Sequence, residues 1–299
     1  LLPGMLKEAV PAARRTARSE LGAPAGGVRH SRKMLILEGC VQPALAPEIN
    51  AAAVRVLDRL GITLIKAPEA GCCGAVSYHL NAQEEGLAYM RRNVDAWWPY
   101  IEPESMETRE SGSVEAIVMT ASGCGVTVKE YGHLLRHDPA YAAKAARIAD
   151  LARDISEILD GENEALARLI AQSSSTGSTA RAAGAAEPEK KIAFHSPCTL
   201  QHGQRVCGMV EKILIMAGFE LTHVPDAHLC CGSAGTYSIL QPELSRQLLE
   251  NKVAALESGA PARIATANIG CLMHMRGGTT LPVEHWIELL DERISGIPD

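Results

Sequence analysis

Aromatic residues are scarce in this chain. Phe, Tyr and Trp make up 4% of its 299 residues, and Phe194 and Phe219 are the two phenylalanines, so the core has to be built mainly from Leu, Ile, Val and Ala. There is also no run of 18 or more apolar residues, which excludes an ordinary membrane-spanning helix. The first residues lack the long apolar core of a secretory signal peptide. We therefore expect a cytoplasmic protein without a transmembrane segment.

The chain also lacks a large excess of charge of either sign. The net charge is −6, with 46% hydrophobic and 21% charged residues, values typical of a soluble globular protein long enough for two domains. A negative balance argues against nucleic acid as a partner. The local exception is a basic arm over residues 1–33, which we interpret as a solvated linker or as a docking surface for an acidic partner or a membrane face. The chain begins with Leu1, so we expect it to be a piece of a longer protein.

Cysteine is the unusual residue, because eight of the nine cysteines form two sets in register. KMLILEGC, AGCCG and ASGCG in the first half reappear as KIAFHSPC, HLCCG and NIGC in the second. Three of the four pairs share an offset of 158 residues and the last an offset of 147, because the first half has an extra acidic loop, EPESMETRESGS. The sets are Cys40, Cys72, Cys73 and Cys124, and Cys198, Cys230, Cys231 and Cys271.

The repeat gives the domain boundaries. Residues 172–190, QSSSTGSTARAAGAAEPEK, have almost nothing to bury and are typical of a flexible linker. We expect a first cysteine-rich domain at 34–171 and a second at 191–299.

Short apolar strands alternate with amphipathic helices in both halves, which predicts an α/β fold of two tandem repeats, each a small, mainly parallel sheet flanked by helices. In such sheets, ligands gather beyond the carboxyl ends of the strands. Because the cysteines follow the expected strands, we expect the cysteine loops at one edge of each sheet. The expected strands are 34–38, 62–66 and 115–121, then 192–195, 219–224 and 262–267, and the helices are 50–60 and 80–98, then 207–217 and 241–257.

Four thiolates from three loops suit an iron–sulfur cluster, and they also suit tetrahedral zinc. Gly74 and Gly232 follow the Cys-Cys pairs and Gly125 follows Cys124, so we expect these glycines to lie against the cofactor, where a backbone without Cβ can approach closely. A disulfide framework is disfavoured by the odd cysteine count and the absent signal peptide. Cys207, the ninth cysteine, is expected to be an inert buried residue in a helix.

The histidines are weaker signals. His274 follows Cys271 by three residues and could share a metal with it, or it could be a surface or capping residue. His195, His202 and His228 flank the second set and could hydrogen-bond near the cluster, but by default we interpret them as polar loop residues. No Ser-His-Asp arrangement, paired carboxylates or nucleotide-binding fingerprint is found, so electron relay is favoured over direct work on an organic substrate.

At these residues the sequence resembles the cysteine-rich CCG modules of heterodisulfide reductases and of iron–sulfur subunits of respiratory dehydrogenases. Longer strings make it most similar to the glycolate oxidase iron–sulfur subunit family, over about residues 33–290. They are LEGCVQPALAPEINAAAVRVLDRLGI, EAGCCGAVSYHLNAQEEGLA, TASGCGVTVKEYG, CTLQHGQ and HLCCGSAGTYSI.

That resemblance implies an electron-transfer subunit of a glycolate dehydrogenase. Its flavoprotein partners oxidise glycolate to glyoxylate, and electrons leave toward a quinone-type acceptor, which would place the protein peripherally at the inner membrane. It also implies an N-terminal ferredoxin-like domain, which is absent here. The fullest CCG motif has a fifth cysteine and holds a non-cubane [4Fe–4S] cluster, but Thr127 and His274 stand at the fifth positions. Cluster type therefore stays open, with zinc as the alternative cofactor. A zinc-containing or metal-free docking module and a heterodisulfide-reductase-like thiol redox subunit are the alternative functions.

Overall fold

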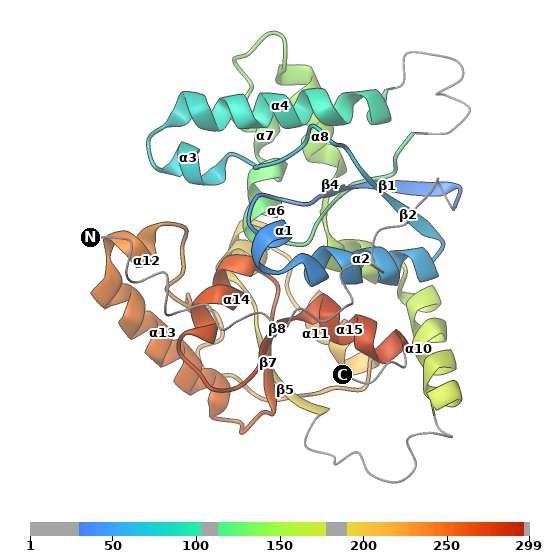
Figure 1. The fold of residues 1–299 in the computed structure, drawn as a ribbon, viewed down its shortest axis with the longest axis vertical. Helices are drawn as coiled ribbons and strands as arrows, with labels where there is room; N and C mark the ends of the chain where they lie inside the picture. The colour runs from blue at the N-terminus through green and yellow to red at the C-terminus, as the bar shows by residue number, and fades with distance from the viewer. Residues whose placement is uncertain (1–29, 103–112, 178–189, 296–299) are drawn as a thin grey trace.

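Two four-stranded sheets, one in each half of the chain, form the framework (Figure 1). The structure is a computed structural model that describes residues 30–102, 113–177 and 190–295. All pairings are parallel, with the orders β2-β1-β3-β4 and β6-β5-β7-β8. The strands are β1 (Arg32–Leu37), β2 (Ile62–Lys66), β3 (Ile117–Met119) and β4 (Ala152–Asp154), then β5 (Lys191–His195), β6 (Glu220–Leu221), β7 (Arg263–Thr266) and β8 (Val283–His285).

The predicted α/β fold with two parallel-sheet repeats is confirmed. The prediction of three strands per sheet is wrong, because each sheet has a fourth strand, β4 or β8, three residues long. Most of the predicted arm and of the acidic loop, together with part of the predicted linker, lie outside the described residues. Two parts of those segments are ordered: Arg32 and Lys33 belong to β1, and the last helix of the first half continues to Gly177.

Helices follow most of the strands. In the first half they are α1 (Gln42–Leu45), α2 (Pro47–Arg59), α3 (Ala75–His79), α4 (Gln83–Ile101), α6 (Ser122–Lys129), α7 (Tyr131–Leu134), α8 (Ala142–Leu151), α9 (Ile155–Gly161) and α10 (Asn163–Gly177). In the second they are the π-helix η2 (Thr199–Gly203), α11 (Met209–Met216), α12 (Tyr237–Leu240), α13 (Pro242–Glu257), α14 (Ile269–Arg276) and α15 (Trp286–Ser295). None of these helices is long and apolar enough to span a bilayer.

Alternation along β1 divides the core in two. Successive side chains of a strand point to opposite faces, so Leu35 and Leu37 pack with Trp97 of α4, while Met34 and Ile36 pack on the other face. That second face belongs to a cluster that continues into the second half of the chain. The two sheets therefore share one of the two hydrophobic clusters, and the other lies within the first half.

The contacts between the halves occur as matched pairs. Helix α2 packs on α15, and α11 packs on α9. In the repeat, α2 corresponds to α11 and α9 to α15, so the two contacts are the same contact with the halves exchanged. Ion pairs follow this pattern: Arg55 Nε lies 2.7 Å from Asp291 Oδ2, and Lys212 Nζ lies 2.7 Å from Asp160 Oδ1.

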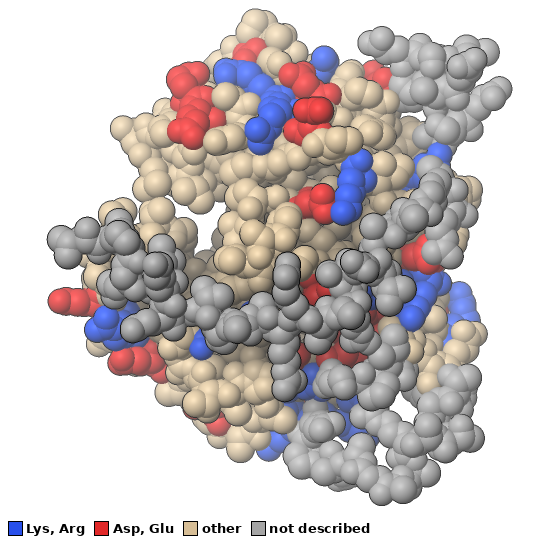
Figure 2. Space-filling view, viewed as in Figure 1, with Lys and Arg blue, Asp and Glu red and all other residues tan. Residues whose placement is uncertain are grey.

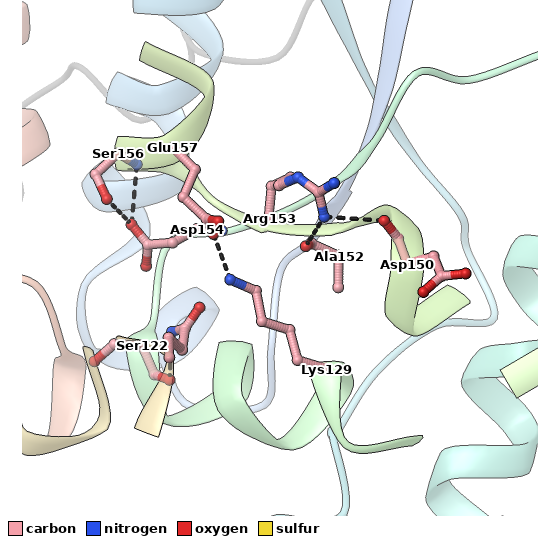
Figure 3. Close-up of polar contacts among 9 residues, drawn as sticks. Ser122, Lys129, Asp150, Ala152, Arg153, Asp154, Ser156 and Glu157 are labelled. Atoms are coloured by element: carbon pink, nitrogen blue, oxygen red, sulfur yellow. Dashed lines mark hydrogen bonds and ion pairs between the residues drawn. The ribbon is translucent and has the colours of Figure 1, made fainter. Parts of the chain in front are cut away.

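The chain turns in the same way after both fourth strands. Asp154 caps α9 by accepting hydrogen bonds from the Ser156 backbone N–H at 2.9 Å and from its hydroxyl at 2.6 Å, while the Glu157 carboxylate accepts from the Asp154 N–H (Figure 3). This is a capping box, which satisfies amide groups that the first turn of a helix leaves free. In the second half His285 takes the place of Asp154, and its Nδ1 accepts from the Ile287 N–H at 3.3 Å.

Candidate metal centres

The four cysteines of the first half meet at the carboxyl edge of their sheet. Cys40 follows β1, Cys124 lies in the first turn of α6 after β3, and the pair Cys72 and Cys73 lies in the loop after β2. Since β2, β1 and β3 are neighbours, the three loops end at the same place. The thiols are close enough to shift one another's pKa in a chain, from Cys40 to Cys72 to Cys73 to Cys124.

The second set repeats this chain, with contacts from Cys198 to Cys230, to Cys231 and to Cys271. One histidine joins it. A ring nitrogen of His195, at the end of β5, and the sulfurs of Cys231 and Cys271 all lie within 4.8 Å of one another. All nine cysteines of the chain are free thiols. The structure thus brings together the four cysteines of each set that the sequence predicted.

Glycine shapes both cysteine-pair loops. Gly74 has φ +87° and Gly232 has φ +92°, in the left-handed region. In each loop the glycine N–H donates to the sulfur two residues earlier, at 3.4 Å to Cys72 and 3.3 Å to Cys230. A Cβ would clash with backbone oxygens of the helix behind, at 2.5 Å from Gly86 O and 2.4 Å from Ser245 O respectively. Glycine is therefore required at both positions.

Neighbouring thiols shift one another's pKa in opposite directions: the pKa is lowered at Cys72, Cys230 and Cys271 and raised at Cys40, Cys73, Cys198 and Cys231. The neighbouring Cys40 thiol, and then Cys73, hold the pKa of Cys72 well below its usual range, while the same contact raises the pKa of Cys40. In the second half, Cys231 is the main cause of the lowered pKa of Cys271, and His195 adds to it. Thiolates are the form that binds metals. The donor set of each half therefore fits an iron–sulfur centre, and four thiolates fit zinc as well.

One side chain connects the two cysteine sets. Asn268 precedes α14 in the second half, and its Oδ1 accepts from the Gly123 N–H of α6 at 3.1 Å. Its Nδ2 faces the Cys271 sulfur at 3.6 Å. Gly123 is bonded directly to Cys124, so the amide of Asn268 lies between a cysteine of each set. A backbone bond from the Ser122 N–H to the Ala267 carbonyl, 3.2 Å long, reinforces the junction.

The remaining predicted residues lie around these sets. A Cβ on Gly125 would come within 2.6 Å of Gln204 of the second half, so the close approach at Gly125 is between the halves. The Thr127 hydroxyl donates to the Gly123 carbonyl of its own helix at 3.1 Å. His274 is 3.3 Å from the Ser245 hydroxyl, outside the group of donors formed by His195, Cys231 and Cys271.

Two predictions made outside the cysteine sets are wrong. Cys207 was expected to be buried in a helix, but it is exposed in the loop before α11, because the helix starts after Gly208 at φ +76°. His195 was interpreted by default as a polar loop residue, but it is 2% exposed at the end of β5, the strand predicted at 192–195. His202 and His228 are exposed, and the ring of His202 contacts the His228 carbonyl at 3.2 Å.

Sequence reasoning also missed Lys252, which lies in α13 with 3% exposure. Its ammonium group donates to the carbonyls of Asp226 at 3.0 Å and Ala227 at 3.3 Å. Burial lowers the pKa of Lys252, and the sulfurs of Cys231 and Cys230 are close enough to oppose that shift. A lysine on a helix gives no signal in the sequence of being buried beside thiolates.

With this geometry in place, comparison with known proteins is informative. The model of the cysteine-rich CCG domain matches residues 34–129 and 192–276, once in each half. The chain belongs to the cysteine-rich CCG domain family. Each matched segment contains all four cysteines of its set.

Relatives of this CCG protein have redox-related names. Over 98% of its length the chain is 50% identical to the glycolate oxidase iron-sulfur subunit of Escherichia coli K12, of which it covers 64%. Over 83% of its length it is 27% identical to the probable glycolate oxidase iron-sulfur subunit of Bacillus subtilis, of which it covers 50%. It is 29% identical over 87% of its length to lactate utilization protein A of Bacillus licheniformis, and it covers all of that protein. The chain thus spans one half to two thirds of the two glycolate oxidase subunits.

Proposed function

We propose that this chain is an iron–sulfur electron-transfer part of a glycolate dehydrogenase. In this proposal flavoprotein subunits oxidise glycolate to glyoxylate, which releases two electrons and two protons, and a quinone-type acceptor finally takes up two of each. The chain itself only relays the electrons. Iron–sulfur centres, when bound, supply single-electron transfer. The proposed ligands are the eight repeated cysteines, and an N-terminal ferredoxin-like domain is proposed as a further partner.

The observation that supports a relay best is the placement of the two cysteine sets on either side of Asn268. A module that needs metal only for stability has no reason to align two donor sets through one amide. Here the Asn268 amide offers a short route of one hydrogen bond, one side chain and one sulfur contact between the sets. It also satisfies an N–H in the first turn of α6, an amide group that the helix itself leaves free.

A 2-hydroxy acid other than glycolate is the second candidate substrate of the assembly. The match to lactate utilization protein A supports it, because the chain covers that protein completely. The higher identity to the glycolate oxidase subunit favours glycolate. Neither acid has to touch this chain, since the electrons reach it through the partner.

The test is a metal analysis followed by a reductive titration. We expect anaerobically purified protein to contain about four iron and four sulfide per half, with two reducible paramagnetic signals. Asn268→Ala should keep the iron, because the first half has alanine at the matching position, Ala121. It should slow electron exchange between the centres, because the amide that connects the two sets is lost. Ser122→Ala, at the same junction, is the matched control. Zinc in place of iron, or no metal, would refute the relay and leave a docking module.

A further inference from the structure

His195 is a buried imidazole for which the fold provides no ordinary partner. It is 2% exposed, and within the described part of the chain neither Nδ1 nor Nε2 has a nitrogen or oxygen hydrogen-bond partner, while the Cys271 sulfur lies within the ring's reach. Burying a polar group without a partner destabilises a protein. A buried imidazole in a central strand is therefore expected to bind a group that is not part of the polypeptide.

The groups within reach of that imidazole are sulfurs of the second cysteine set. His195 lies within 4.8 Å of Cys231 and Cys271 through its ligand nitrogen. The imidazole therefore lies beside two sulfurs of the second set, and it is placed there by the end of β5, three residues before Cys198.

The matching position in the first half is not a histidine. The residue 158 positions before His195 is Leu37, which packs in the core with Trp97. Since the loops otherwise match, the imidazole is an addition to one site rather than a general requirement of the fold. His274, which stands at the Cys-x-x-Cys position, is engaged with the Ser245 hydroxyl instead.

We propose that His195 is a ligand of the metal centre in the second half, so that this centre has four thiolates and one imidazole while the first has thiolates alone. This inference rests on the proposed function, since it assumes that the second set holds iron. An imidazole added to four thiolates is a neutral ligand present at one centre only, and the potential of an iron–sulfur centre depends on its ligands. The two centres would then differ in potential because of one strand residue.

The experiment uses the protein labelled with ¹⁵N-histidine and reduced until the second centre is paramagnetic. Pulsed EPR should show a strongly coupled histidine nitrogen, because only a directly bound nitrogen gives such a coupling. His195→Cys should abolish this coupling, retain the iron and lower the midpoint potential of one centre. His274→Leu, the matched control from the same site, should keep the coupling.

The outcomes separate this inference from the proposed function. Iron present with no strongly coupled nitrogen, or with a coupling that persists in His195→Cys, would overturn the assignment and leave the relay intact. A coupling lost in His274→Leu alone would transfer the role to that residue. No iron in either half would refute the proposed function, and the ligand assignment with it. If His195→Cys fails to fold, His195→Gln gives the same spectroscopic test.

Discussion

The two halves share a topology and a cysteine pattern, yet their centres have different surroundings. In the first half, Cys40 is exposed and Cys124 is half-buried, whereas their counterparts Cys198 and Cys271 are half-buried and buried. Thiolates in the second half therefore have less contact with water. The repeated fold sets the position of the sulfurs, and the residues around them differentiate the two sites.

Three residues beside the cysteines are more polar or more positively charged in the second half than in the first. Leu37 is replaced by His195, Ala121 by Asn268, and Asn93 of α4 by Lys252 of α13. The first-half Asn93 is neutral: it accepts from the Gly71 N–H and donates to the Cys72 carbonyl. Lys252 brings a buried positive charge instead. Positive charge and polar donors near a centre favour its reduced form, so we expect the second centre to have the higher potential and electrons to run toward it.

The largest effect is expected from removing one cysteine of either set. Cys72→Ser should empty the first site and Cys231→Ser the second, because a centre with a missing thiolate binds metal poorly. Each variant should lose about half of the iron and one of the two reduced signals. Cys207→Ser is the control, because this exposed thiol belongs to neither set. Loss of both signals in a single variant would show that the halves do not form separate centres.

The two capping residues predict opposite effects of pH on stability. Burial raises the pKa of Asp154 to about 6 (Figure 3). Its contribution to stability is full below the unfolded pKa of 3.8 and is lost as pH rises through 6. Burial lowers the pKa of His285 to about 4, so its contribution is full above 6.5 and is lost as pH falls through 4. Each change amounts to about 3 kcal/mol.

Asparagine at either position keeps a capping group without the titration. Relative to wild type, the stability of Asp154→Asn should increase from pH 4 to pH 7, while that of His285→Asn should decrease. Urea unfolding midpoints at equal metal content measure both trends. Trends of the same sign in the two variants would contradict this account.

A smaller effect is expected from the buried charge. Lys252→Met keeps most of the side-chain volume but removes the ammonium, and it should lower the potential of the second centre by roughly 50–100 mV, the Coulomb energy of one charge at about 8 Å in a medium of effective dielectric 20. Arg92→Met is the matched control, because Arg92 lies near Cys72 but is exposed, so water and salt screen it. Equal shifts in redox titrations of the two variants would remove Lys252 from the comparison.

The sequence predicted the cysteine sets well because a duplicated motif is visible in the residues themselves. It missed β4 and β8, since strands of three residues such as Ala-Arg-Asp and Val-Glu-His have no alternation long enough to detect. Lys252 was missed for another reason, and His195 was noted only as a residue flanking the second set. Their roles depend on burial beside residues distant in the chain, which no local pattern encodes.

The arrangement of charges on the surface could not be predicted from the sequence either. On the face drawn in Figure 2, basic and acidic groups lie next to one another, including over α4 at the top of the view. An open groove of about 500 Å³ beside α4 is lined by Arg91, Arg92, Asp95 and Glu69 among others. Net charge and composition contain no information about such interleaving, because it arises from which helix faces outward.

The exchanged contacts of α2 with α15 and of α11 with α9 bear on the history of the molecule. A surface that meets its own counterpart in this reciprocal way is what two identical copies related by a twofold axis would form. A single ancestral half would have had such a surface before its gene was duplicated and fused. Once one chain encoded both copies, each could accumulate its own substitutions, and an imidazole or an ammonium could be added to one centre without appearing in the other.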